Sequence, residues 1–187
     1  MVEACIYTSI DSGTTWAHQA SPPIWAYSIA SSDGMKLAVG GSNGDIYTSV
    51  NGGTTWARQA SAPRNNWKAI VSSSYGMNLT AVIDAGDIYT NVDSGTMWTP
   101  QASAPTIAYW RSISSSSDGM KLAAVVSGGG IYTSVDGGTT WTPQASAPTA
   151  DWQAVASSSD GMKLAAGAKG GCIYTSVNSG THLEGIV

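Results

Sequence analysis

The sequence predicts an all-β fold built from repeated four-stranded sheets, and three observations support this. The tripeptide Ile-Tyr-Thr recurs at near-regular spacing, beginning at Ile6, Ile46, Ile88, Ile131 and Ile173. The chain has 22 Gly and is rich in Ser, Thr, Val, Ile, Tyr and Trp, a mixture that suits short strands and tight turns. Each period also holds four strand-like runs. Repeats of roughly 40–45 residues made only of strands and turns are typical of a β-propeller with one antiparallel blade per repeat.

The last full period shows the four expected strands of a blade most clearly. They cover residues 152–159, 162–168, 131–135 and 139–144. Asp160-Gly161 separates the first two runs, and this dipeptide is a strong hairpin signal because both central residues of a type I′ turn need positive φ. Pro143 in the fourth run, and Pro100 in the equivalent run, fit an edge strand, where a missing N–H costs little.

We expect residues 1–187 to form a single propeller domain of about four blade-equivalents, with a partial repeat at Ile173. Complete blades are expected to start near Trp25, Trp67 and Trp110. The fourth starts near Trp152, and residues 5–19 can supply its third and fourth strands. The ring would then be closed by strands from both termini, which removes exposed sheet edges.

The C-terminus contains its own third strand, residues 172–177, so two segments compete for one place in the fourth blade. Two ring sizes follow from the repeat number. One chain can close a four-bladed ring, which is the interpretation we favour, and the alternative is an eight-bladed ring made by two chains.

A second repeated phrase follows each Ile-Tyr-Thr. Residues 9–16 and 134–141 read Ser-x-Asp-x-Gly-x-Thr-Trp, residues 49–56 differ by Asn51, and residues 91–98 differ by Asn91 and Met97. Residues 176–183 have Asn178 and end in Leu183 instead of Trp. This pattern resembles the Asp-box, or BNR repeat, of sialidase-like, sortilin-like and photosystem-assembly-like propellers.

The resemblance implies that the phrase is a folding element on the rim opposite the active face. The chemistry of the residues agrees, because Asp or Asn accepts hydrogen bonds from its own turn, Gly adopts positive φ and Trp packs between blades. The structural positions are Asp11, Gly13, Trp16, Asn51, Gly53, Trp56, Asp93, Gly95, Trp98, Asp136, Gly138 and Trp141.

The loops that differ between repeats are better candidates for function. They are the blade-to-blade connections and the loops between second and third strands, and alternating strand directions bring both to one face. Aromatic side chains beside Asn, Asp and Arg suit glycan binding, because a flat ring covers one sugar face while polar groups pair with hydroxyls. The candidate ligand-binding residues are Trp25, Asn43, Asp45, Arg64, Asn65, Asn66, Trp67, Asp84, Asp87, Tyr109, Trp110, Asp151 and Trp152.

Other interpretations of the same residues remain open. Trp25, Trp67, Trp110 and Trp152 recur once per repeat, so the alternative role for them is to seal blade junctions. The competing function class is a protein–protein interaction scaffold, which would need a broader apolar surface. A glycoside hydrolase is a further alternative, with a carboxylate pair drawn from Asp45, Asp84, Asp87 and Asp151.

We predict a binding module and not an enzyme. The resemblance raises the possibility of a sialidase, which needs three clustered arginines and a Tyr–Glu pair. Here Arg58, Arg64 and Arg111 stand at three different positions of the repeat, and the two glutamates, Glu3 and Glu184, lie near the ends of the chain. These residues do not assemble such a site.

Composition narrows the partners further. The formal net charge is −4 and the eight basic residues are scattered, so nucleic acid is not an expected partner. No apolar run is long enough to cross a bilayer and no signal peptide is recognisable, and the compartment is left open. Cys5 and Cys172 occupy equivalent repeat positions without metal-ligand spacing, so no metal or cofactor is expected.

Overall fold

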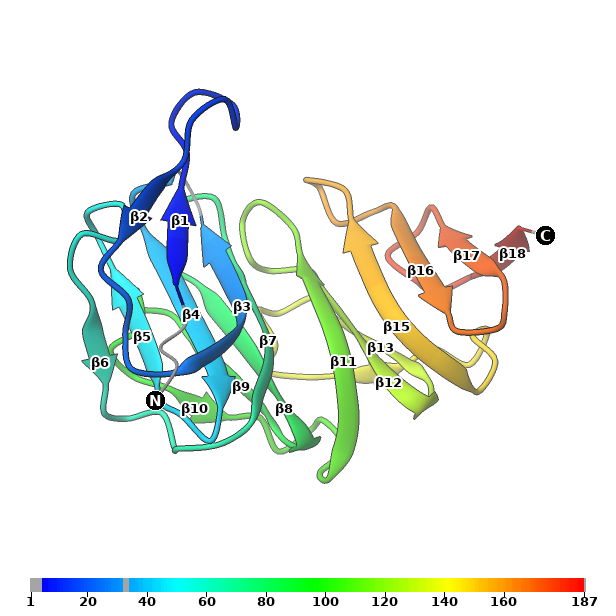
Figure 1. The fold of residues 1–187 in the computed structure, drawn as a ribbon. Helices are drawn as coiled ribbons and strands as arrows, with labels where there is room; N and C mark the ends of the chain where they lie inside the picture. Colours follow the sequence, from blue (N-terminus) through cyan, green and yellow to red (C-terminus); the bar gives the residue numbers. More distant parts are fainter. Residues whose placement is uncertain (1–4, 32–33, 187) are drawn as a thin grey trace.

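The computed structural model describes residues 5–31 and 34–186, and over these residues it contains 18 strands and no helix. The strands form one hairpin and four antiparallel units of four strands each (Figure 1). The N-terminal hairpin consists of β1 (Ile6–Thr8) and β2 (Ala17–Gln19). Unit 1 consists of β3 (Trp25–Ser31), β4 (Leu37–Ser42), β5 (Ile46–Ser49) and β6 (Ala57–Gln59). Unit 2 consists of β7 (Trp67–Ser72), β8 (Leu79–Gly86), β9 (Ile88–Asn91) and β10 (Thr99–Pro100).

Units 3 and 4 repeat the same strand order. Unit 3 consists of β11 (Ala108–Ser115), β12 (Leu122–Gly129), β13 (Ile131–Ser134) and β14 (Thr142–Pro143). Unit 4 consists of β15 (Ala150–Ser157), β16 (Leu164–Ala168), β17 (Ile173–Ser176) and β18 (Glu184–Ile186). Short bridges from β8 to β11 and from β12 to β15 connect units 2, 3 and 4.

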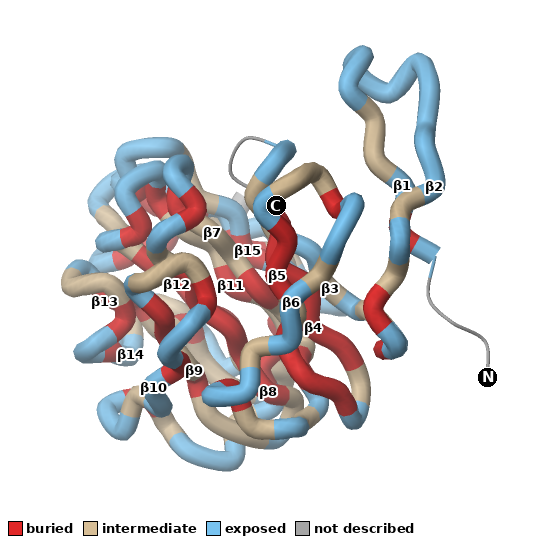
Figure 2. The backbone as a smooth tube through the Cα atoms, turned by 90° about the vertical axis from the view of Figure 1, so that its left-hand side faces the viewer, coloured by how far each residue is buried: buried red, intermediate tan, exposed pale blue. Residues whose placement is uncertain are grey.

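The core lies in the junctions between successive units. At the junction of units 1 and 2, Trp67 is 1 % exposed and packs against Ala38 and Ile46 of the preceding unit. Its ring meets Tyr89 edge-on, with centroids 5.4 Å apart. Trp110 and Trp152 have the same role at the next two junctions. In Figure 2 the buried stretches of the backbone run through the inner strands, including β11 and β4. Buried aromatic pairs of this geometry contribute about 0.5–1.5 kcal/mol beyond the apolar area that they bury.

The repeated phrase forms the same tight turn between the third and fourth strands. In unit 3, Asp136 Oδ1 accepts hydrogen bonds from Ser134 Oγ at 2.8 Å and from the backbone N–H of Thr140 at 2.9 Å. Gly138 has a φ of 89°, and its carbonyl accepts a bond from Trp141 Nε1. Because these contacts are local, the turn forms wherever the phrase occurs.

Asparagine replaces aspartate in two of these turns without loss of the main contacts. Asn51 Oδ1 accepts bonds from Ser49 Oγ and from the N–H of Thr55, both at 2.9 Å. Asn178 Oδ1 makes the equivalent contacts with Ser176 Oγ and the N–H of His182. The side-chain oxygen at this position therefore accepts the same two hydrogen bonds whether the residue is aspartate or asparagine.

The two rims of the molecule carry different turns and loops, because successive strands of a unit run in opposite directions. On one rim, the turn of the repeated phrase bonds to the turn between the first and second strands, as Gly137 N–H does to the Met120 carbonyl at 2.9 Å. The variable loops meet on the other rim, where Gly44 and Asn65 exchange backbone hydrogen bonds of 3.1 and 3.0 Å. We call these the repeated rim and the variable rim.

The expected closure of unit 4 by N-terminal strands does not occur among the described strands. β16 pairs with β17, and β17 pairs with β18, whereas β1 pairs only with β2. The hairpin and β17–β18 lie on opposite sides of the view in Figure 1. The physical reason is local: β17 follows β16 through a short loop, so pairing costs less chain entropy than recruiting the distant β1.

The remaining sequence-based expectations concern cysteines and membranes. Cys5 is exposed and Cys172 half-buried, and both are free thiols. Within residues 5–31 and 34–186, no helix could cross a membrane. No cluster of potential metal-ligating side chains occurs in that part of the chain.

Candidate functional site

Unit 1 differs from the other units in the register of its first strand. Trp25 and Trp67 precede Leu37 and Leu79 by the same number of residues, yet β3 pairs Ser31 with Leu37 whereas β7 pairs Ser72 with Leu79. This shift of one residue turns the side chains of β3 to the opposite face. Trp25 is consequently 65 % exposed.

The described residues before unit 1 form less than a full unit, and this accounts for the exposure of Trp25 in the structure. Trp67 is covered by Ala38, Ile46 and Ala62, which belong to unit 1 and its connection to unit 2. Before unit 1, the described strands provide only the hairpin β1–β2, and the small cluster there is formed around Ile6 and Ile24. Within the described residues, Trp25 therefore does not pack in a junction like the one that holds Trp67.

Trp25 and its neighbours line a pocket of about 460 Å³ on the variable rim. The residues that line it are Pro23, Ile24, Trp25, Tyr27, Ser42, Asn43 and Gly44. Tyr27 is 60 % exposed, and Lys68 Nζ lies 5.7 Å from the centroid of its ring. The pocket thus combines two accessible aromatic faces with hydroxyl and amide groups.

The connection between units 1 and 2 holds the polar wall of the pocket in place. Asn66 Oδ1 accepts hydrogen bonds from Asn43 N–H at 2.9 Å and from Ser42 Oγ at 3.1 Å. Arg64 Nη2 donates to the Asn43 carbonyl at 3.3 Å. Asn43 adopts a φ of 48°, which asparagine tolerates better than most residues do. These contacts leave the Asn43 side chain exposed at the pocket.

Asp45 lies behind this wall and is committed to internal pairing. Its carboxylate accepts two contacts from Arg58, at 2.8 Å from Nε and 3.0 Å from Nη2, and Arg64 Nε lies 3.9 Å away. The hydrogen bond from Arg58 lowers the pKa of Asp45, although burial opposes this shift. The residue therefore shapes the loop as a carboxylate and is almost completely buried.

The other candidate carboxylates lie apart from this pocket. Asp84 approaches Arg111 Nη1 at 3.8 Å, and its backbone N–H bonds to the Asn66 carbonyl. Asp151 accepts hydrogen bonds from Ser127 Oγ at 2.5 Å and Gln153 Nε2 at 2.7 Å. Asp87 is half-buried directly before β9. Tyr109 pairs with Asp84 across β11 and β8 and is exposed.

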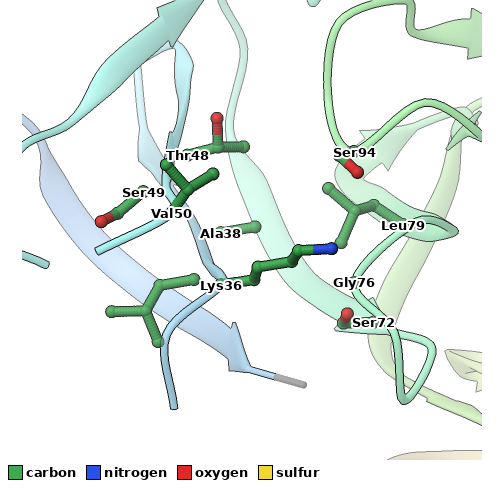
Figure 3. A pocket seen from close by; sticks show the side chains of 10 residues that line it. Lys36, Ala38, Thr48, Ser49, Val50, Ser72, Gly76, Leu79 and Ser94 are labelled. Atoms are coloured by element: carbon green, nitrogen blue, oxygen red, sulfur yellow. The ribbon is translucent and has the colours of Figure 1, made fainter. Parts of the chain in front are cut away.

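A second cavity, on the repeated rim, is too small to hold an organic ligand. It lies between units 1 and 2 and has a volume of about 10 Å³, which is close to the minimum for one water molecule. Figure 3 shows the Lys36 side chain extending across it toward Gly76. Lys36 Nζ donates to the Tyr75 carbonyl at 2.7 Å, so this ammonium group connects adjacent turns.

Comparison with known proteins identifies the fold. No protein-family model and no curated protein sequence matches the chain. A solved structure of YCF48 bound to D1 peptide is similar over 100 % of this chain and 63 % of its own, with a TM-score of 0.72 and 20 % identity. YCF48 from Cyanidioschyzon merolae is similar over 97 % and 63 %, with a TM-score of 0.71 and 20 % identity.

A GH74 xyloglucanase from Xanthomonas campestris is also similar, over 100 % of this chain and 34 % of its own, with a TM-score of 0.78 and 18 % identity. The chain has a β-propeller fold. It spans less than two thirds of the length of each of these proteins. At this level of identity the likeness concerns the propeller fold and not the function.

Within the propeller, the predicted site residues separate into several groups. One group, on the variable rim between units 1 and 2, is formed by Trp25, Asn43, Asp45, Arg64, Asn65 and Asn66. The prediction that Trp67, Trp110 and Trp152 contact a ligand is wrong, because all three are at most 1 % exposed. All three belong to the apolar clusters at the junctions, as the alternative interpretation of these residues expects.

Sequence reasoning missed two residues that shape the pocket. Tyr27 stands where the other repeats have Ala69, Ser112 and Ala154 relative to the recurring Trp, and this difference could have identified it. Arg58 stands where the equivalent repeats have Pro100 and Pro143. Both signals appear only in a comparison of the repeats with one another.

Proposed function

We propose that the chain is a non-enzymatic binding module that holds its ligand in the Trp25 pocket on the variable rim. The observation that carries this proposal is the combination of exposed Trp25 and Tyr27 with Ser42 and Asn43 in a hollow of about 460 Å³. Concave sites with aromatic walls and a few fixed polar groups are typical of small-ligand binding.

A glycan is the ligand class that this chemistry fits best. The flat face of Trp25 can cover the apolar side of a sugar ring, and the amide of Asn43 can pair with hydroxyl groups. The side chains of Asn66 and Arg64 bond to the backbone of Asn43 and hold that backbone in place before binding, which reduces the entropy lost in the complex.

Binding of a peptide or a protein is the second candidate function, and a specific comparison favours it. The similar YCF48 structure holds a D1 peptide. Exposed aromatic rings and an arginine are also the groups that recur at energetically important positions of protein interfaces. The Trp25 pocket, with Arg64 beside it, would accept an aromatic or acidic peptide side chain.

The pairing of the acidic residues supports binding without catalysis. A glycosidase acid needs a raised pKa, whereas Arg58 lowers the pKa of Asp45. Asp84 lies beside Arg111, and Asp151 accepts two side-chain hydrogen bonds.

We further propose that the repeated turns are Asp-box repeats. In this interpretation Asp11, Asp93 and Asp136 stabilise their turns by accepting hydrogen bonds and do not bind a ligand.

Parallel screening on a glycan array and a peptide array tests the proposal. We expect reproducible glycan binding that is lost in Trp25→Ala and weakened at least tenfold in Tyr27→Ala, measured by titration calorimetry with the best ligand. Tyr75→Ala is the matched control, because Tyr75 is also an exposed aromatic residue but lies on the repeated rim. Binding to peptides alone would select the second candidate, and binding that survives Trp25→Ala would contradict the assigned site.

A further inference from the structure

The N-terminal hairpin corresponds to the third and fourth strands of a unit, which we call its outer half; the first and second strands are its inner half. β1 and β2 pair Ile6 with Gln19 and Thr8 with Ala17. β5 and β6 have the same register and nearly the same residues, pairing Ile46 with Gln59. In unit 1, however, β4 covers the other edge of β5, whereas β1 pairs with β2 alone among the described strands. One edge of β1 therefore offers unpaired backbone groups.

Side chains of the hairpin are exposed where the equivalent side chains of a complete unit are covered by its inner strands. Tyr7 is 54 % and Trp16 is 63 % exposed, whereas Trp141, the equivalent of Trp16 in unit 3, is 6 % exposed and packs against Trp110. Tyr7 and Trp16 line a groove of about 710 Å³ between the hairpin and unit 1. Figure 2 shows the hairpin projecting from the rest of the molecule, with mostly exposed backbone.

The chain itself contains a strand, β16, whose edge already binds a second copy of the β1 sequence. Residues 5–9 and residues 172–176 have the same sequence, Cys-Ile-Tyr-Thr-Ser. β16 binds the second copy through the pairs Ala165 with Thr175 and Ala166 with Tyr174. Because the backbone and side chains of β1 are the same, the edge of β16 can pair with β1 in the same register.

We propose that β1–β2 of one copy of the chain replaces β17–β18 at the edge of β16 in a second copy. Two copies that exchange reciprocally form a closed, symmetric dimer in which no β1 edge is left open. Each inner pair β15–β16 then receives its outer strands from the partner, and the β17–β18 segments are displaced.

Contacts in the hairpin favour it over the segment that it replaces. Asp11 accepts hydrogen bonds from Ser9 Oγ at 2.8 Å, from Thr15 N–H at 2.8 Å and from Thr15 Oγ1 at 2.6 Å. The corresponding Asn178 accepts only the first two types of contact in the described residues. Trp16 also offers a larger apolar surface than Leu183, and Trp152 of the partner would bury it as Trp110 buries Trp141.

The hairpin can pair with a second copy without leaving unit 1. Ser21 Oγ accepts a bond from Ile6 N–H at 3.0 Å, and Trp56 Nε1 donates to the Ala20 carbonyl at 2.6 Å. Ile6 also packs with Ile24 and Val39. Exchange therefore competes with local pairing of β17 and is expected to increase with protein concentration.

Engineered disulfides in the full chain test this exchange. In a Cys5→Ser, Cys172→Ser background, Thr8→Cys with Ala165→Cys joins the strands that the proposal pairs. The matched control is Thr175→Cys with Ala165→Cys, which joins strands paired in the structure. Directly paired strands place Cα atoms within the range that a disulfide spans.

We expect the Thr8/Ala165 variant to form a reductant-sensitive covalent dimer on non-reducing gels, while the control forms a cross-link at monomer mass. A Thr8/Ala165 variant that stays uncross-linked, or that cross-links within one chain, overturns the proposal. Native mass spectrometry of the unmodified chain gives a readout that is independent of engineering. Dimers that increase with concentration support exchange, and monomers alone over the full concentration range contradict it.

Discussion

Asn66 Oδ1 accepts a hydrogen bond of 2.9 Å from the backbone N–H of Asn43, and this contact connects the first two units on the variable rim. The same oxygen receives Ser42 Oγ at 3.1 Å. One amide of the connecting segment therefore holds both polar residues of the Trp25 pocket. Ligand affinity and local stability should consequently depend on the acceptor oxygen at position 66.

Replacing this acceptor is the first prediction. Asn66→Ala removes the partner of two donors, so the free energy of unfolding should fall by about 1 kcal/mol. Ligand affinity should fall as well, because Asn43 is no longer held. Asn66→Asp keeps the acceptor and is the control, and urea titration of both variants measures the difference. Equal stability of Asn66→Ala and the wild type would show that the contact does not hold the loop.

The second prediction separates core from surface tryptophans. Trp110→Ala empties a filled junction and removes the bond from Nε1 to the Gly86 carbonyl at 3.0 Å, so it should cost about 3–5 kcal/mol. Trp25→Ala should change the free energy of unfolding by less than about 0.5 kcal/mol. Urea unfolding followed by circular dichroism measures both. A large cost of Trp25→Ala would mean that the register shift in β3 does not hold in solution.

The third prediction concerns the pair between Asp45 and Arg58. Arg58→Ala leaves a buried carboxylate without its main partner, so we expect the free energy of unfolding to fall. The loss should be smaller than for a fully buried pair, because half of the Arg58 side chain is exposed to screening solvent. Asp45→Asn in the same background should recover part of this loss, because the unpaired charge is removed. A double-mutant cycle in urea gives the coupling free energy. Strictly additive effects would contradict a direct interaction.

The fourth prediction concerns acid stability through the repeated turns. Burial raises the pKa of Asp136, but bonds from Thr140 and Ser134 outweigh it, so the pKa is below its ordinary value of 3.8. A carboxylate with a lowered pKa in the folded state stabilises the fold above its unfolded pKa. That stabilisation is lost as the pH falls below about 4.

Asp136→Asn should therefore lose less stability than the wild type between pH 4 and pH 2, since Asn51 shows that an amide can cap this turn. Urea midpoints at several pH values measure the slope. Identical slopes for the two proteins would show that Asp136 does not contribute to acid unfolding. At position 11, bonds from Thr15 and Ser9 lower the pKa of Asp11 to about 2, so the hairpin turn should titrate within the same range.

The local features of this protein follow from short stretches of sequence. The turns of the repeated phrase can be inferred from the sequence because each donor and acceptor lies within a few residues, as in Asp136 and Thr140. The four-strand period was predicted from the recurring Ile-Tyr-Thr and the strand-like runs between its copies. The role of Trp67 as a junction residue was one of two alternatives, because periodic spacing does not distinguish a buried ring from an exposed one.

Two features depend on contacts between distant segments. The register of β3 differs by one residue from that of β7, although Trp25 and Trp67 occupy equivalent positions in the repeat. The exposure of Trp25 and the pocket beside it therefore depend on how the described strands assemble and not on the repeat spacing. Residues 5–9 and 172–176 are identical, so no local signal indicates which of them pairs with β16. Short loop closure favours Thr175 over Thr8 within one chain, because proximity along the chain lowers the entropy cost of pairing.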